Sequence, residues 1–305
     1  MVVKLENAGI AFLMVVIAGL ATGIGAAVVF CEKLVSLASK RMLAASLAFS
    51  AGIMLYVSFI EIFHKAKQGF VDAGIDDKHA YMLSTLCMFG GMLLMRLLTA
   101  VTRVLDPGQD DFQIMVPDSG ASEGLDNSEA AQSESSHASN PADPKKRNRE
   151  KKLLRMGLNT ALAITIHNVP EGVAGMVAGL IDPTVGFTLV AAIAIHNIPE
   201  GLCIALPIYY STGSRLMGFV LAILSGLAEP IGAFIAWAIV AASGEDLNGV
   251  VYGILFGIVA GIMIMIVAVE LLPTAHRYDP KDTVATHGLA AGMLVMAMSL
   301  VLFLM

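Results

Sequence analysis

Residues 160–210 read TALAITIHNVPEGVAGMVAGLIDPTVGFTLVAAIAIHNIPEGLCIALPIYY, and this stretch contains the hexapeptide HNxPEG twice. The copies are His167-Asn-Val-Pro-Glu-Gly172 and His196-Asn-Ile-Pro-Glu-Gly201. Each copy lies within an apolar run of the length that crosses a bilayer, which predicts membrane-spanning helices over 153–180 and 185–207. The stretch therefore predicts two successive spans that carry the same polar cluster.

Each hexapeptide is expected to present a set of ligands on one helix face. On a helix, His and Glu at positions i and i+4 share a face, and Asn at i+1 lies three residues before that Glu. Pro170 and Pro199 lack an N–H and press against the carbonyls of Ile166 and Ile195, so we expect kinks with unpaired backbone oxygens there. A single membrane histidine is usually a hydrogen-bond partner between helices, but two copies of the whole cluster indicate a ligand site.

The composition indicates that the whole chain is a membrane protein. The sequence of 305 residues is 56% hydrophobic and 14% charged, with a mean hydropathy of +0.75. Soluble globular proteins carry about 25% charged residues, so an ordinary soluble protein is excluded. The three cysteines lie far apart and favour neither a disulfide framework nor a thiolate zinc site. Eight spans are predicted, over residues 9–30, 42–63, 81–101, 153–180, 185–207, 216–242, 250–272 and 287–305.

Two pairs of spans repeat one another. Residues 18–26 of the first span align without gaps with 225–233 of the sixth, and 51–66 of the second align with 260–275 of the seventh. Each pair would cross the membrane in opposite directions, which is typical of inverted-topology repeats. Chance similarity among small apolar residues is the alternative. The predicted fold class is an all-α membrane protein, in which spans 1–3 and 6–8 form an inverted repeat around central spans 4 and 5.

The loops predict the orientation of the chain. Fourteen lysines and arginines fall on the side of the first connection and four on the other side, so the positive-inside rule places both termini outside. Residues 106–150, rich in Ser, Asp, Asn, Ala and Pro, are then expected to be a disordered cytoplasmic loop. This loop holds ten acids and four bases, whereas the rest of the chain balances at 15 against 15. Residues 1–305 are otherwise expected to form one transmembrane domain.

Acidic side chains are concentrated within the predicted spans. The basic residue clearly inside a span is Arg96, whereas five glutamates lie there: Glu61, Glu171, Glu200, Glu229 and Glu270. A charge at a helix centre costs roughly 2.5–3.5 kcal/mol on insertion scales, so cations or protons must offset these carboxylates. Imidazole beside carboxylate favours a first-row transition metal over magnesium or calcium. Zn(II) fits well, and Fe(II) or Mn(II) also suit the oxygen donors.

Three further sets of candidate residues lie outside the hexapeptides. Glu229-Pro230 occupies the place where the first span has Thr22-Gly23, so we expect Glu229 to be a ligand of an asymmetric site. Glu61 and His64 form either an entrance site or a pair that simply faces water. Glu270 and His276 form a matching exit toward the cytoplasm, with the same alternative.

The chain closely resembles the ZIP family of divalent metal transporters, in particular its bacterial ZupT-type branch. The residues that carry the resemblance are the two hexapeptides, Ser225-Gly-Leu-Ala-Glu-Pro-Ile-Gly232 and Tyr56-Val-Ser-Phe-Ile-Glu-Ile-Phe63. The resemblance implies metal movement into the cytosol across a bacterial inner membrane, through a two-metal site between the fourth and fifth helices. It implies one metal on His167, Glu171, His196 and Glu200, and a second on Asn168, Glu171, Asn197, Glu200 and Glu229.

The leading functional hypothesis is therefore uptake of divalent transition metals, zinc first, with iron and manganese plausible. An intramembrane metal-dependent hydrolase is an alternative, since an embedded metal can activate water, but the chain has no HExxH motif. A metal-gated channel or a proton-coupled exporter with the same ligands is another alternative. The expected partners are the metal ions and the lipid bilayer, with no prosthetic group and no nucleic acid, and a homodimer is left open.

Overall fold

The computed structural model describes residues 5–37, 39–105, 144–243 and 249–304, and all the regular structure in these ranges is helical. Eight helical segments are long and apolar enough to cross a membrane. They correspond to the eight predicted spans. In order, they consist of η1 (Leu5–Asn7), α1 (Ala8–Ala26) and η2 (Ala27–Phe30); α3 (Lys40–Tyr56), η3 (Val57–Ile62) and α4 (Phe63–Asp72); α5 (Asp77–Leu105); α6 (Pro144–Ile181); α7 (Pro183–Thr212); α8 (Arg215–Gly226) and α9 (Ala228–Ser243); α10 (Gly249–Ile266), η4 (Val267–Leu271) and α11 (Leu272–Tyr278); and α12 (Ala285–Leu304).

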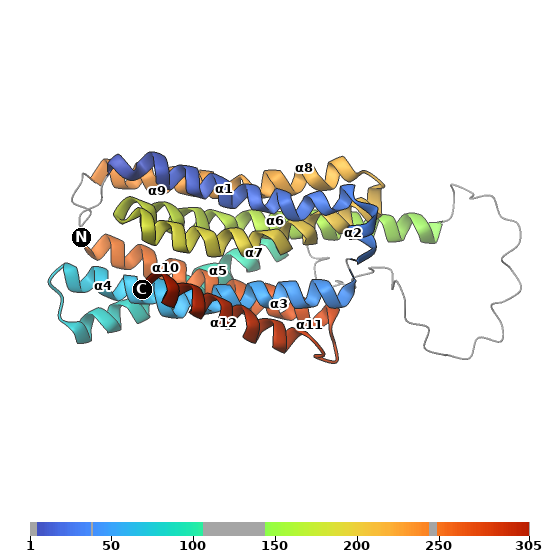
Figure 1. Ribbon diagram of the computed structural model, residues 1–305. Coiled ribbons are helices and arrows are strands. Elements are labelled where there is room, and N and C mark those ends of the chain that lie inside the picture. Colours follow the sequence, from blue (N-terminus) through green and yellow to red (C-terminus); the bar gives the residue numbers. More distant parts are fainter. Residues whose placement is uncertain (1–4, 38, 106–143, 244–248, 305) are drawn as a thin grey trace, which may run out of the picture.

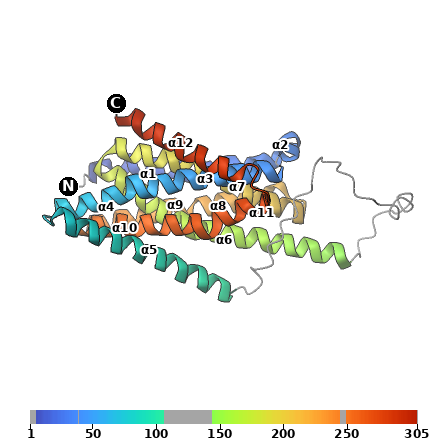
Figure 2. The same ribbon diagram turned by 90° about the horizontal axis from the view of Figure 1, so that it is seen from below.

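The helices lie in three layers, with α6 and α7 in the middle (Figure 1). On one side α1 packs against α7 and α9 packs against α6, while on the other side α3 contacts α7 and α10 contacts α6. Helix α12 packs on α3 and α5 packs on α10, as the second view also shows (Figure 2). The short helix α2 (Glu32–Leu37) joins the first two spans. The two hexapeptides are thus enclosed by helices from both ends of the chain.

The outer surface of α1 is apolar. Its exposed residues recur at helical spacing: Ile10, Leu13, Ile17, Leu20 and Ile24. A water-facing helix would present polar side chains on this face, and soluble proteins rarely expose apolar patches of this extent. This apolar surface is therefore suited to contact with lipid.

Local signals explain where the central helices begin and end. Asp182 Oδ1 accepts the backbone N–H of Thr184 at 2.8 Å, and Pro183 occupies the first turn of α7. Helix α7 ends at Gly213, whose φ of +70° suits a residue without a side chain. Helix α6 begins at Pro144, ahead of residue 150 where we expected the loop to end, and the rest of that loop, 106–143, lies outside the described residues.

The backbone irregularities lie partly where the sequence predicts them. Helices α6 and α7 continue through Pro170 and Pro199, so these prolines do not end either helix. The sixth span does break at Leu227, because Pro230 cannot tolerate a helical carbonyl at Gly226. Two further irregularities were not predicted, because no proline marks them: η3 and η4 are π-helical, and they contain Glu61 and Glu270 respectively.

Glycines bring the helix backbones into direct contact. A Cβ placed on any of these glycines would overlap the facing carbonyl group. Four of these contacts form two matching pairs, in which the residues occupy corresponding positions of the repeated segments. In the first pair, Gly172 faces Glu229 and Gly201 faces Thr22. In the second pair, Gly232 faces Val169 and Gly25 faces Ile198. Gly19 and Gly226, which are also aligned positions, face each other. The helices around the hexapeptides are thus held at the closest distance that their backbones allow.

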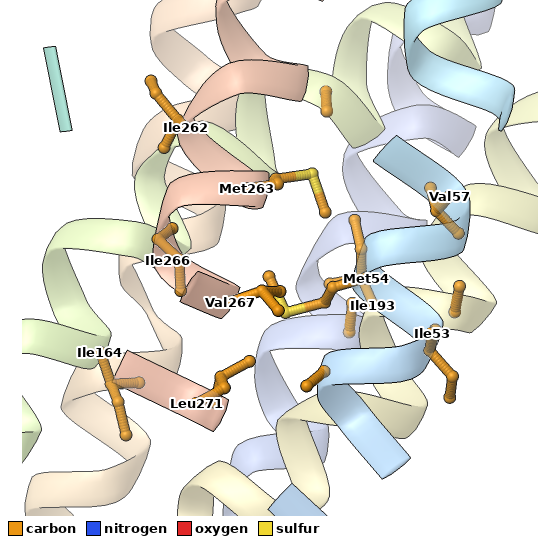
Figure 3. Close-up of a cluster of buried hydrophobic side chains, with 14 of the residues drawn as sticks. Ile53, Met54, Val57, Ile164, Ile193, Ile262, Met263, Ile266, Val267 and Leu271 are labelled. Carbon is orange, nitrogen blue, oxygen red and sulfur yellow. The ribbon is translucent and has the colours of Figure 1, made fainter. Parts of the chain in front are cut away.

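An apolar core fills the space between α3, α10 and the central pair. Figure 3 shows Met54, Val267 and Ile193 lying together, with Ile164 of α6 at the edge of the cluster. Ile164 and Ile193 each precede the histidine of a hexapeptide by three residues, so this core adjoins the polar residues directly.

Candidate metal site

The seven residues predicted as central ligands are all buried. His167, Asn168, Glu171, His196, Asn197, Glu200 and Glu229 are each at most 1% exposed. Among the described residues, the buried charged side chains include no lysine or arginine. The glutamates of this cluster therefore have no lysine or arginine buried with them to balance their charge.

The histidines and glutamates are paired between helices. His167 Nε2 lies 3.1 Å from Glu200 Oε1, and His196 Nε2 lies 3.1 Å from Glu171 Oε1. Spacing alone placed His and Glu of the same hexapeptide on one face, but each histidine bonds to the glutamate of the other copy. The two copies thus form one site across the contact between α6 and α7. The spacing of residues within a single helix cannot predict such pairing between helices.

The two asparagines are held in equivalent ways. Asn168 Nδ2 donates to the backbone oxygen of Ser225 at 3.1 Å, and Asn197 Nδ2 donates to that of Ala18 at 2.8 Å. Asn197 Nδ2 also donates to Glu229 Oε1. Because the amide nitrogens are held by neighbouring helices, each side-chain oxygen is left facing the cluster without a donor.

Buried polar atoms without a partner gather at this site. Among the described residues the buried side-chain atoms that lack a hydrogen bond are His167 Nδ1, Asn168 Oδ1, Glu171 Oε2, Asn197 Oδ1, Glu200 Oε2, Glu229 Oε2 and Thr22 Oγ1. All but the last belong to predicted ligands. A buried polar atom without a partner costs about 1–3 kcal/mol, and more when it is charged, so such a concentration indicates that something else binds there. Most of these atoms are oxygens, which favours a cation.

The side chains do not yet surround a common point. In the described ranges no three His, Cys, Asp or Glu side chains are grouped so that they could hold an ion as they stand. The imidazole nitrogens are instead engaged with carboxylates of the opposite helix. To bind an ion, these side chains would have to break their hydrogen bonds to one another and form bonds to the metal.

The predicted exit residues occupy the inner end of the seventh span. Glu270 Oε2 lies 3.5 Å from His167 Nδ1, and this carboxylate is 24% exposed. Glu270 therefore adjoins both the buried cluster and the solvent. His276 is about half exposed, with its Nδ1 4.0 Å from Asp282 Oδ1. Hydrogen bonds from the side chain and backbone of Thr286 hold the pKa of Asp282 below its usual range.

The predicted entrance residues lie where η3 meets α4. Glu61 Oε1 accepts an ion pair from Lys65 Nζ at 2.9 Å, with the two side chains 26% and 17% exposed, while the expected companion His64 is exposed. The Glu61–Lys65 ion pair could have been predicted from the sequence, because Glu at i and Lys at i+4 are neighbours on a helix. The other residue that our sequence reasoning did not assign is Thr22.

The chain is similar to known membrane transporters over nearly its whole length. The family described as "ZIP Zinc transporter" matches residues 106–300. A protein of Streptococcus mutans named zinc transporter ZupT is 41% identical over 298 residues, which cover 96% of this chain and 97% of that protein. Proteins of the same name from Chlorobaculum parvum and Clostridium perfringens are 42% and 39% identical, over 96% and 99% of this chain and 97% and 98% of their own lengths.

Proposed function

Because the chain belongs to the ZIP zinc transporter family, we propose that this membrane transporter moves zinc into the cytosol through a binuclear site between α6 and α7. Fe(II) and Mn(II) are further substrates in this proposal. A protein of this family is a transporter and not an enzyme, which removes the hydrolase alternative. The observation that carries the proposal is the reciprocal pairing of each histidine with the glutamate of the other helix, together with side-chain oxygens of Asn168, Glu171, Asn197, Glu200 and Glu229 that have no hydrogen-bond partner.

The proposed ligands divide into two sets that share two carboxylates. One metal takes His167, Glu171, His196 and Glu200, and the other takes Asn168, Glu171, Asn197, Glu200 and Glu229. Each bridging glutamate already uses one oxygen for a histidine and has a second oxygen without a donor. A dication that enters would replace the histidine–glutamate hydrogen bonds with metal–ligand bonds and neutralise the buried charge.

We propose that spans 1–3 and 6–8 are an inverted repeat around the central pair. The matched contacts of Gly172 with Glu229 and of Gly201 with Thr22 support this, because the facing residues occupy aligned positions in the sixth and first spans. A symmetric scaffold around a central ion site can open to either side by moving one set of helices against the other. Both rocking and an elevator-like slide satisfy this arrangement.

The proposed route runs from Glu61 and His64 at the outer end to Glu270 and His276 at the inner end. In this orientation both termini lie outside a bacterial inner membrane, as the basic loops favour. The two ends differ in the structure, since Glu270 adjoins His167 of the central cluster whereas Glu61 is held by Lys65. We infer that this arrangement connects the central site to the inner side.

Flux into proteoliposomes tests the proposed function. Vesicles that contain the purified chain and a zinc-sensitive dye should show saturable zinc influx, and Fe(II) and Mn(II) should compete with it, because their ligand preferences overlap with those of zinc. Empty vesicles are the control. Absence of influx from a protein that still binds zinc would overturn the transport proposal, and unsaturable, channel-like flux would favour the metal-gated channel.

Removal of Lys65 tests the outer part of the route. In Lys65→Met the ammonium no longer competes for Glu61, so we expect external zinc to half-saturate uptake at a concentration about two- to fivefold lower. Lys67→Met is the matched control, because Lys67 pairs with Asp77 at 2.7 Å and not with Glu61. Initial rates against external zinc measure the effect. An unchanged or higher half-saturation concentration in Lys65→Met would remove Glu61 from the route.

A further inference from the structure

Among the described residues, Thr22 is the one buried side chain that has a polar atom without a hydrogen-bond partner and that is not in the proposed ligand sets. It lies in α1, is 0% exposed, and its Oγ1 has no hydrogen-bond partner. A hydroxyl both donates and accepts, so burial without any partner is unfavourable unless something else binds it. Every other such atom in the described residues belongs to the central cluster.

The neighbouring asparagine explains why the hydroxyl lacks its usual partner. Helical Ser and Thr normally donate to the carbonyl four residues earlier, as Thr165 does to Ala161 at 2.7 Å and Thr99 to Met95 at 2.9 Å. For Thr22 that carbonyl belongs to Ala18, which instead accepts Asn197 Nδ2 at 2.8 Å. The amide of a proposed ligand thus takes the acceptor that would otherwise satisfy Thr22.

Thr22 occupies the position that corresponds to Glu229. The two residues align in the first and sixth spans, and their backbones contact Gly201 and Gly172, which follow the two bridging glutamates. A Cβ placed on Gly226 would lie 3.0 Å from Thr22 Oγ1, and the residue before Gly226 is Ser225, whose carbonyl holds Asn168. The hydroxyl therefore adjoins the central cluster on the side opposite Glu229.

From this placement we propose that Thr22 is a further oxygen donor of the central site, which holds a water molecule that the transported cation retains. This inference rests on the proposed function, since it needs the cation between α6 and α7. A threonine side chain is shorter than that of glutamate, so a water fills the distance that the carboxylate spans on the other side. The water would accept or donate at Thr22 Oγ1 and bind the cation through its own oxygen.

A retained water matters most to cations that prefer many ligands. Mn(II) favours octahedral oxygen coordination, whereas Zn(II) is commonly satisfied by four ligands. Thr22 is therefore expected to favour manganese relative to zinc. This selectivity separates a role in ion binding from a role in helix packing, which would affect both metals equally.

The test uses thermal unfolding of the purified full chain, titrated with Mn(II) or Zn(II). In Thr22→Val a methyl replaces an unsatisfied hydroxyl, so the metal-free midpoint should equal or exceed that of the native chain. The Mn(II) concentration that produces half of the stabilisation should rise about tenfold, with a smaller rise for Zn(II). Thr22→Ser keeps the hydroxyl and should behave like the native chain. Thr99→Val, which removes a hydroxyl already bonded within α5, is the matched control.

Each other outcome has a definite meaning. If Thr22→Val responds to both metals as the native chain does, or loses metal-free stability with no change in metal response, the hydroxyl is structural and the inference is wrong. If the half-stabilising concentrations of Mn(II) and Zn(II) rise equally in Thr22→Val, the proposal that the cation retains a water is wrong. If the native chain itself gains no stability from either metal, the central site proposed above fails, and the inference about Thr22 fails with it.

Discussion

Replacement of Glu171 or Glu200 with glutamine is expected to reduce zinc uptake at least about 100-fold. Each carboxylate is at most 1% exposed and is proposed to bridge both metals. Glutamine keeps an oxygen that can accept the histidine hydrogen bond, but it removes the negative charge that offsets the dication. A charged ligand lost from a buried site costs several kcal/mol of binding, and each 1.4 kcal/mol is a factor of ten.

The same substitutions should leave the metal-free protein folded. A buried carboxylate without a cation is unfavourable in an apolar environment, so its neutralisation is expected to preserve or raise the unfolding midpoint. Proteoliposome uptake and thermal unfolding of each variant measure the two effects separately. Glu32→Gln is the control, because Glu32 lies on exposed α2 and pairs with Arg215 at 2.7 Å. Uptake near the native rate in either central variant would rule out a bridging role for that glutamate.

Gly201→Ala is expected to abolish transport through a loss of helix packing. A Cβ at this position would lie 2.8 Å from the carbonyl carbon of Thr22 and 3.0 Å from the nitrogen of Ala26. Both atoms belong to the backbone of α1, which cannot rotate away as a side chain can. Overpacking costs about 1–3 kcal/mol even in cores that relax, and here α1 and α7 must separate beside the proposed ligands.

Gly90→Ala provides the matched control. Gly90 is also inside a membrane-spanning helix, α5, but a Cβ there would have nothing within 4 Å. This change should be neutral or stabilise the chain by about 0.4–1 kcal/mol, since alanine restricts the unfolded backbone. The yield of monodisperse protein and its unfolding midpoint measure both variants. A native-like midpoint and uptake in Gly201→Ala would show that the close helix contact is not required.

Much of the architecture could be predicted from the sequence, because membrane spans are long and apolar. All eight predicted spans correspond to helical segments of suitable length and composition. Their ends were less accurate: the second span reaches Asp72 and the seventh Tyr278, as amphipathic turns extend beyond the apolar runs. Hydropathy identifies the apolar segment that lies within the bilayer, but it does not show how far the helix continues beyond that segment.

The arrangement of the site was less accessible to sequence reasoning. Spacing identified the buried residues of both hexapeptides, but the partner of each histidine depends on how α6 and α7 pack together. The sequence reasoning grouped Glu61 with His64 and did not assign the ion pair that Glu61 forms with Lys65. Thr22 carried no signal of its own, because a helical threonine normally bonds to its own backbone, and only the contact of Asn197 with Ala18 prevents this. The ligand sets themselves stay a prediction.

The two π-helical turns bear on the origin of the proposed inverted repeat. A π turn contains one residue more than an α turn, so it arises when a single residue is inserted into a regular helix. Such turns are rare, yet η3 and η4 lie at aligned positions, and each contains the glutamate of its segment, Glu61 or Glu270. Under the proposed inverted repeat, one insertion in an ancestral three-helix gene, followed by duplication and fusion, would account for both turns. On that proposal, the placement of both glutamates would be older than the joining of the two halves into one polypeptide.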